Sequence, residues 1–207
     1  MIRTRLQTIS LATLLAGFPL LPACAQSASF PVSTRPVNAA DVEFMSGMIP
    51  HHAQAVVIGG WAATHTTRRD VRVLAERIVV AQRDEIELMQ HWLRDRGQPV
   101  PAADATHHRM VMGGMEHDML MPGMLTDAEL AQLNAAREGE FDRLFLTFMI
   151  RHHEGALVMV EKLFAAYGAA QDEVVFRFGS DVFADQTTEI DRMGKMLDAG
   201  GGSPPRP

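Results

Sequence analysis

One twelve-residue stretch of the sequence occurs twice, about a hundred residues apart. The first copy, residues 44–55, reads FMSGMIPHHAQA, and the second, residues 145–156, reads FLTFMIRHHEGA. Both copies keep a Met-Ile step and two adjacent histidines in the same frame of apolar residues. A repeat of this length indicates a duplicated structural unit, so the rest of the chain either supports the two copies or joins them.

Each copy lies in a segment whose apolar residues recur at helical spacing and form a wide apolar stripe on one face. His51 and His152 lie on one row of this apolar face, and His52 and His153 lie on the adjoining row, so both histidines of each pair face the same side. The stripes run through Phe44, Met48, His51, Ala55 and Ile58, and through Phe145, Met149, His152, Ala156 and Met159. A second motif follows each copy, as Gln82-x-x-Glu85-Ile86-x-x-Met89 and again as Gln186-x-x-Glu189-Ile190-x-x-Met193. Each half therefore reads as a helical hairpin with an apolar face that it cannot bury alone. Two such hairpins predict an all-α four-helix bundle.

Capping and helix-breaking residues predict where the helices end. Asn38 is a candidate N-cap, Thr126 opens a capping box with Glu129, and Gly97 and Gly168 are candidate C-caps. We expect helices at about 38–66, 70–96, 126–138, 140–167 and 171–199, and no segment alternates like a strand. The bundle is thus expected over 38–199, with repeat halves 38–97 and 139–199, a linker at 98–125 and a short helix at 126–138.

The first 25 residues have the composition of an export signal. Arg3 and Arg5 precede an apolar run at 9–21 that is too short to span a bilayer, and small residues follow. Residues 23–25 fit ordinary signal-peptide cleavage, while residues 21–24 resemble a lipoprotein site in which Cys24 carries a lipid. We expect residues 26–37 to form a flexible tether, residues 200–207 a disordered tail, and the protein to be periplasmic or secreted.

Charge and missing motifs exclude several function classes. The formal net charge of −6 argues against a nucleic-acid partner and is compatible with binding cations. Cys24 is the only cysteine, so a soft metal ligand in the mature chain must be methionine. The chain has no Glu-x-x-His, Gly-rich phosphate loop or Gly-x-Ser-x-Gly motif, which argues against a ferritin-type dinuclear centre and against the usual enzymes. Nothing in the sequence indicates the oligomeric state.

The linker concentrates histidine and methionine. Within eighteen positions it holds three histidines and six methionines: His107, His108, Met110, Met112, Met115, His117, Met119, Met121 and Met124. Glycine and proline interrupt this run, so no helix can bury it, and exposed thioethers without a packing role are prone to oxidation. Thioether and imidazole together suit Cu(I), and by the same softness Ag(I). The linker is therefore predicted to bind a soft metal ion.

The histidines on the apolar stripes allow two interpretations. His51, His52, Gln82 and Glu85 need partners in the core. They can bond to one another across the helices and act as structural polar residues, or they can hold a metal. The residue pattern alone leaves both open. His65, near the end of a predicted helix, is interpreted as a residue that is solvated or favoured by the helix dipole rather than as a ligand.

Together these motifs resemble a known family. The motif Met-Ile-x-His-His-x-x-Ala occurs twice, each copy is followed by Gln-x-x-Glu-Ile-x-x-Met, and Met121-Pro122-Gly123-Met124 lies between them. Over about residues 40–197 this arrangement resembles the bacterial family DUF305. The resemblance implies a ferritin-like four-helix bundle and, as in studied periplasmic members, copper binding linked to metal tolerance. Besides the Met-Pro-Gly-Met segment, the candidate ligands implied by the motif match are Met48, His51, His52, Gln82, Glu85, Met89, Met149, His152, His153, Gln186, Glu189 and Met193. Two departures are Gly59-Gly60 within the first helix and Arg151 in place of the proline seen at Pro50.

The leading hypothesis is an exported, non-enzymatic protein that sequesters or hands on Cu(I) for metal tolerance, with Ag(I) as a second possible ion. Two alternatives stay open: a metal-dependent redox enzyme with its site in the bundle core, and a metal-free bundle with a structural or interaction role. A membrane association is expected only through a lipid on Cys24.

Overall fold

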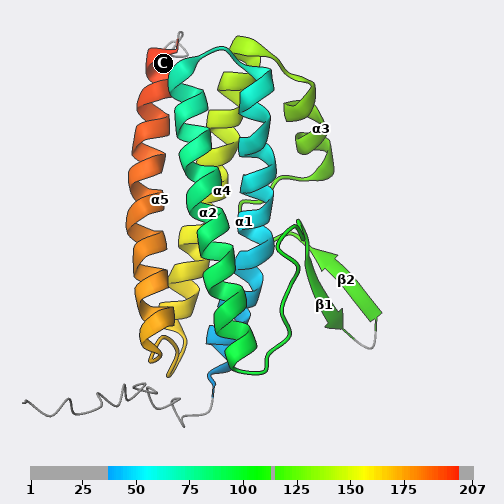
Figure 1. The fold of residues 1–207 in the computed structure, drawn as a ribbon, viewed down its shortest axis with the longest axis vertical. Coiled ribbons are helices and arrows are strands. Elements are labelled where there is room, and N and C mark those ends of the chain that lie inside the picture. The colour runs from blue at the N-terminus through cyan, green and yellow to red at the C-terminus, as the bar shows by residue number, and fades with distance from the viewer. Residues whose placement is uncertain (1–36, 113–114, 201–207) are drawn as a thin grey trace, which may run out of the picture. The chain divides into compact units, whose positions relative to one another are not determined.

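A computed structural model of the protein describes residues 37–112 and 115–200. Its helices are α1 (Ala39–His65), α2 (Arg69–Asp95), α3 (Asp127–Ala135), α4 (Glu138–Ala165) and α5 (Glu173–Ala199), with strands β1 (His108–Met112) and β2 (Met115–Met119). The four long helices form a bundle (Figure 1), which confirms the predicted fold class. Within the described part, no helix is both long and apolar enough to cross a membrane. The predicted signal segment, residues 26–36 of the tether and residues 201–207 of the tail lie outside the described residues.

The helix ends follow from the predicted caps. The Asn38 side chain accepts a hydrogen bond from the Ala40 amide at 2.9 Å, and Thr126 and Glu129 form the full capping box of α3. Gly97 and Gly168 have φ angles of 63° and 71°, a left-handed conformation that favours glycine after a helix. Local side-chain chemistry therefore accounts for these helix boundaries.

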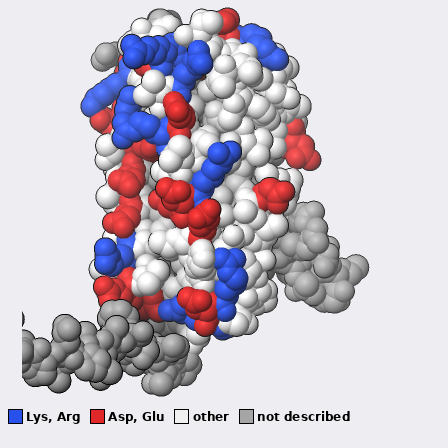
Figure 2. Space-filling view, viewed as in Figure 1, with Lys and Arg blue, Asp and Glu red and all other residues white. Residues whose placement is uncertain are grey.

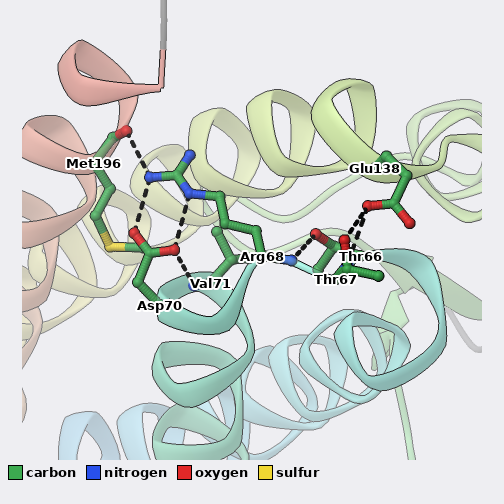
Figure 3. A network of polar contacts seen from close by, with 7 residues as sticks. All are labelled: Thr66, Thr67, Arg68, Asp70, Val71, Glu138 and Met196. Atoms are coloured by element: carbon green, nitrogen blue, oxygen red, sulfur yellow. Dashed lines mark hydrogen bonds and ion pairs between the residues drawn. The ribbon is translucent and has the colours of Figure 1, made fainter.

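Contacts between helix ends show how the two hairpins are arranged. At one end Asp41 of α1 accepts the Ala170 amide, which follows α4, at 2.7 Å. At the other end Thr67, which follows α1, donates its amide and its hydroxyl to Glu138, the first residue of α4 (Figure 3). Helices α1 and α4 therefore run antiparallel.

Helices α2 and α5 are also antiparallel neighbours. Arg96 after α2 pairs with Asp172 before α5 at 2.6 Å, while Arg68 before α2 donates to the Met196 carbonyl near the end of α5 at 3.1 Å (Figure 3). Helices α2 and α4 therefore run in the same direction. The connection between them, residues 96–137, must therefore return along the length of the bundle. We call this connection the crossover, and a single long crossover is typical of ferritin-like folds.

The crossover contains a β-hairpin that we did not expect from the sequence. Strands β1 and β2 pair antiparallel, with His108 opposite Met119 and Met112 opposite Met115. The prediction that no segment forms a strand was wrong here. The missed signal is Gly113-Gly114 between two short runs, because a two-residue glycine turn is typical of hairpins.

The core of the bundle consists of two apolar clusters separated by a polar layer. One cluster includes Met45, Ile49, Met89 and Val160, and the other includes Ile58, Leu74, Phe145 and Met193. The repeated histidines of α1 and α4, and the repeated Gln and Glu of α2 and α5, lie at the boundary between the two clusters. In each helix, residues of one cluster precede them in the sequence and residues of the other follow them. We call this layer the waist, and define it as His51, His52, Gln82, Glu85, His152, His153, Gln186 and Glu189.

Candidate metal centre at the waist of the bundle

The waist contains two matching histidine–glutamate pairs. His52 of α1 lies with its Nε2 atom 2.7 Å from the carboxylate of Glu85 on α2, and His153 of α4 lies 2.7 Å from Glu189 on α5. A carboxylate accepts a hydrogen bond, so each Nε2 carries the proton and donates it. In the neutral imidazole the Nδ1 atom then keeps its lone pair. Both Nδ1 atoms are buried and have no hydrogen-bond partner.

The other two histidines face each other across α1 and α4. The ring centroids of His51 and His152 are 3.9 Å apart, with an angle of 39° between the planes. The Nε2 atom of His51 donates to the Pro122 carbonyl at 3.0 Å, whereas neither ring nitrogen of His152 has a hydrogen-bond partner. The repeated histidine pairs thus bring four fully buried imidazole rings into one layer.

Burial sets the protonation of the facing pair. It lowers the pKa of His51 to about 3, with a further contribution from nearby His52. Burial also lowers the pKa of His152 well below its ordinary value, and the neighbouring histidines add to the effect. Both rings are therefore neutral near pH 7, and each retains a nitrogen lone pair that a metal ion can use.

The remaining predicted ligands of the bundle line the waist or flank it. Gln82 and Gln186 are buried one turn before the two glutamates, and their side-chain oxygens have no hydrogen-bond partner. The four methionines among these predicted ligands are fully buried, Met48 and Met89 in one apolar cluster and Met149 and Met193 in the other.

The two glutamates connect the waist to the surface. Their side chains are about one quarter exposed, at 23% for Glu85 and 24% for Glu189. The pKa of nearby Asp185 is raised, mainly by partial burial and then by the negative charges of Glu85 and Glu189. Figure 2 shows acidic side chains interspersed with Lys and Arg on the face on which α2 and α5 lie. The three carboxylates of Glu85, Asp185 and Glu189 place negative charge at the outer ends of the His–Glu pairs, where it attracts cations.

One segment of the crossover, residues 121–125, is packed against the waist. The side chain of Gln54 makes two buried hydrogen bonds to the backbone of Leu125, accepting the amide at 2.7 Å and donating to the carbonyl at 3.0 Å. A Cβ atom at Gly155 of α4 would overlap the Pro122 carbonyl, so only glycine admits the chain there. Gly123 has a φ of 77° and lies against the Arg151 carbonyl. These contacts hold the Pro122 carbonyl at His51.

The His/Met run of the linker is divided by this arrangement. The side chain of His107 is partly exposed and lies 3.7 Å from Asp127, and Met119 is 43% exposed. Met124 was expected to be exposed and is instead buried, and its sulfur accepts a hydrogen bond from the Met121 amide at 3.2 Å. His108, Met110, Met112, Met115 and His117 are strand residues whose side chains lie outside the described part of the structure.

Some polar residues near the waist were missed or misread in the sequence. Gln54, Gly155 and the Arg151–Glu129 pair, at 2.6 Å, make contacts that depend on the path of the crossover. The only signal for Gln54, Gly155 and Arg151 was that the two repeats differ at these positions. His65 lies in the last turn of α1, but it is buried against Phe141 and bonded to Asn134, so the interpretation that it is solvated was wrong.

The donors of the waist suit a soft metal ion rather than a hard one. Among the residues that the structure describes, no three His, Cys, Asp or Glu side chains form a cluster suited to a metal. Cu(I) and Ag(I) do not need such a cluster, because they accept as few as two soft or borderline ligands. Four buried imidazoles with unpartnered nitrogens, two of them held by carboxylates, fit such an ion.

Comparison with known proteins gives the family. Residues 41–197 match the family described as a domain of unknown function, DUF305. The chain is a member of the DUF305 family. A curated relative, the uncharacterized protein L153 of Acanthamoeba polyphaga mimivirus, is 34% identical over 56 residues, which cover 27% of this chain and only 37% of that protein.

Solved DUF305 structures share the fold. A protein from Streptomyces coelicolor, named as a secreted DUF305 protein, is 28% identical with a TM-score of 0.66, covering 81% of this chain and 97% of that one. A DUF305 fragment from Deinococcus radiodurans is 28% identical with a TM-score of 0.65, covering 80% and 99%. CopM in its Cu(I)-bound form is 26% identical with a TM-score of 0.60, covering 78% and 98%. CopM has also been solved in Cu(II)-bound and Ag-bound forms.

Proposed function

We propose that this DUF305 protein is an exported copper-binding protein that holds Cu(I) at the waist of its bundle and sequesters it or hands it on. The observation that carries the proposal is the set of four buried imidazoles with unpartnered nitrogens. A buried polar atom without a partner is costly, so its repetition in both halves calls for an occupant.

The two His–Glu pairs support ligation through Nδ1. Histidines that bind metals usually donate the other ring N–H to a carboxylate or a carbonyl, which fixes the tautomer and the ring orientation. His52 and His153 meet this description through Glu85 and Glu189, and His51 meets it through the Pro122 carbonyl. In this proposal Glu85 and Glu189 orient the ligands, and Gln82 and Gln186 line the site.

The choice of Cu(I), with Ag(I) as a second ion, rests on ligand softness and on the relatives. The soft or borderline donors at the waist are imidazole nitrogens, buried methionine thioethers flank it in both apolar clusters, and the described core offers no thiolate. CopM, which shares this fold, has been solved with Cu(I), Cu(II) and Ag. The predicted export signal supports a periplasmic or secreted location, and the Streptomyces relative is likewise named as a secreted protein.

The crossover residues extend the proposal. We propose that His107, His108, Met110, Met112, Met115, His117 and Met119 supply a second set of donors for capturing ions. Met121 and Met124, which were predicted with them, instead lie beside the waist, where Met124 is buried. This part is tested by counting the Ag(I) ions bound by a variant that keeps residues 119–125 and carries substitutions at His107, His108, Met110, Met112, Met115 and His117. Residues 121–125 must stay because they pack against the waist.

The decisive experiment observes the histidine ring nitrogens. Full-length protein labelled with ¹⁵N in histidine is titrated with Ag(I), and long-range ¹H–¹⁵N spectra report each ring nitrogen. We expect the Nδ1 signals of His52 and His153 and a ring-nitrogen signal of His152 to shift, while the Nε2 atoms of His52 and His153 stay protonated. If only His107, His108 and His117 respond, the waist is structural and the proposed site is wrong.

A companion measurement separates binding from catalysis. Purified protein loaded with copper is assayed for turnover of oxygen and peroxide, and we expect stoichiometric binding without turnover. Turnover that disappears in His52→Ala and His153→Ala would instead assign the waist to a redox enzyme.

A further inference from the structure

A second place in the molecule brings soft donors together, outside the waist and outside the repeated motifs. An open pocket of about 180 Å³ lies between the first part of α1, the last part of α4 and the crossover. Met121 of the crossover and Met159 of α4 both line it, beside Phe44, and the ion pair of Glu43 and Lys162, at 2.7 Å, stands at the same pocket.

The two thioethers converge on one glycine of α1. The terminal methyl of Met121 lies 2.8 Å, and that of Met159 3.6 Å, from the position that a Cβ atom would take at Gly47. The Met121 sulfur lies 3.8 Å from the same point. The two side chains therefore come from different elements and end within one small volume.

The sequence departs from the repeat where the thioethers meet. Gly47 corresponds to Phe148 in the second copy, and Met159 corresponds to Ile58 in the first. A glycine inside a helix is disfavoured relative to alanine, so its use here requires a reason. The structure supplies one, since any side chain at Gly47 would displace the Met121 methyl. The pocket is thus made by features that only one side of the bundle has.

The backbone near Met121 is held in place. The Met124 sulfur accepts the Met121 amide at 3.2 Å, and the Met124 amide donates to the Met121 carbonyl at 3.2 Å. The next carbonyl along the chain, that of Pro122, accepts the hydrogen bond from His51. The Met121 side chain therefore stands next to the waist and also borders a pocket that opens to solvent.

We propose that Met121 and Met159 form a thioether site for a soft monovalent ion, Cu(I) or Ag(I), between solvent and the waist. Thioethers select such ions over hard cations, and the flexible ends of two methionines can turn their sulfurs toward a shared ion. The site deepens the proposed function, because it would receive the ion that the waist binds.

The test uses the methionine methyl groups as probes. Full-length protein carrying ¹³C-methyl methionine is titrated with Ag(I), and the signals of the two residues are assigned from Met121→Leu and Met159→Leu. We expect both methyl signals to shift together. The double Leu variant should bind one equivalent of Ag(I) fewer than the wild type. Met196→Leu, which alters a buried methionine of the other apolar cluster, should leave the titration unchanged.

Gly47→Ala provides a second variant that keeps both sulfur atoms. Its new methyl group would occupy the place of the Met121 methyl, so the response of Met121 to Ag(I) should be lost while the helix is retained. An unchanged response in Gly47→Ala would overturn the proposed geometry.

The outcomes distinguish this inference from the proposed function. If the waist histidines respond to Ag(I) and the Met121 and Met159 methyls do not, the thioether site is wrong and the waist stands. If neither set responds, both are wrong. If the methyls shift with a short-chain alkyl detergent but not with Ag(I), the pocket binds apolar groups and the inference is overturned.

Discussion

His51 and His152 occupy equivalent positions in the two repeats, yet only His51 has a hydrogen-bond partner. The His–Glu pairs, in contrast, are the same in both halves, each with an N–O distance of 2.7 Å. The difference comes from the crossover, which lies along the bundle once and can satisfy only one half. The His–Glu pairs are therefore the same in both halves of the bundle, whereas the contacts made by the crossover differ between the halves.

Equivalent residues have diverged around the crossover. Gln54 binds the Leu125 backbone, whereas its counterpart Gly155 has no side chain and admits the Pro122 carbonyl. Arg151, the counterpart of Pro50, pairs with Glu129 of α3, and this holds the pKa of Glu129 at about 2. A duplicated hairpin thus keeps the residues of its waist in both halves and adapts other positions to one long connection.

The largest effect is expected from Gly155→Ala. The new methyl group would overlap the Pro122 carbonyl, so the crossover must move away from α4 and from His51. We expect the free energy of unfolding to fall by about 3 kcal/mol, since overpacking against backbone outweighs the gain in helix propensity. Urea denaturation measures this. Gly194→Ala in α5, which has open space around it, should be stabilising, and equal effects of the two variants would contradict the contact.

The symmetric pairs should respond symmetrically. His52→Ala and His153→Ala each remove a buried ring that donates to a glutamate, so each should lower the free energy of unfolding by about 2 kcal/mol or more. We expect the two losses to agree within about 0.5 kcal/mol. Thermal and urea unfolding of metal-free protein provide the measurement. A loss confined to one half would show that the pairs are not equivalent.

Acid should destabilise the metal-free protein before most carboxylates titrate. The pKa values of His51 and His152 are lowered in the folded state, so the unfolded chain binds more protons below about pH 6.5. Their contribution to stability is complete above that pH and declines as the pH falls toward 3. We expect about 1.4 kcal/mol per pH unit for each histidine, measured by urea denaturation between pH 6.5 and 5. A flat profile would mean that the rings are not buried as neutral groups.

The smallest effect separates the facing histidines. His51→Leu leaves the Pro122 carbonyl without its donor and should cost about 1–2 kcal/mol. His152→Leu removes two unpartnered nitrogens and should be neutral or slightly stabilising in metal-free protein. Parallel denaturation of both variants tests the asymmetry. The reverse order would show that the crossover does not satisfy His51.

The helices and the residues of the waist could be predicted from the sequence because their signals are local or repeated. Helical spacing placed His51 and His152 on apolar faces, and caps such as Asn38 and Thr126 predicted helix ends. The partners of Gln54 and Gly155 could not be predicted, because they depend on where a long connection lies in space. Met124 was misjudged for the same reason, since its burial follows from the turn beside the waist.

Binding of Cu(I) at the waist can be separated from folding with His152→Leu, because this variant should keep its fold. Cu(I) affinity is measured by competition with a chromophoric chelator under reducing conditions, for full-length wild type and variant. If the waist binds Cu(I) as proposed, His152→Leu unfolds at the same or a higher urea concentration but loses the ion bound at the waist. Wild-type Cu(I) stoichiometry and affinity in a well-folded His152→Leu protein would contradict it.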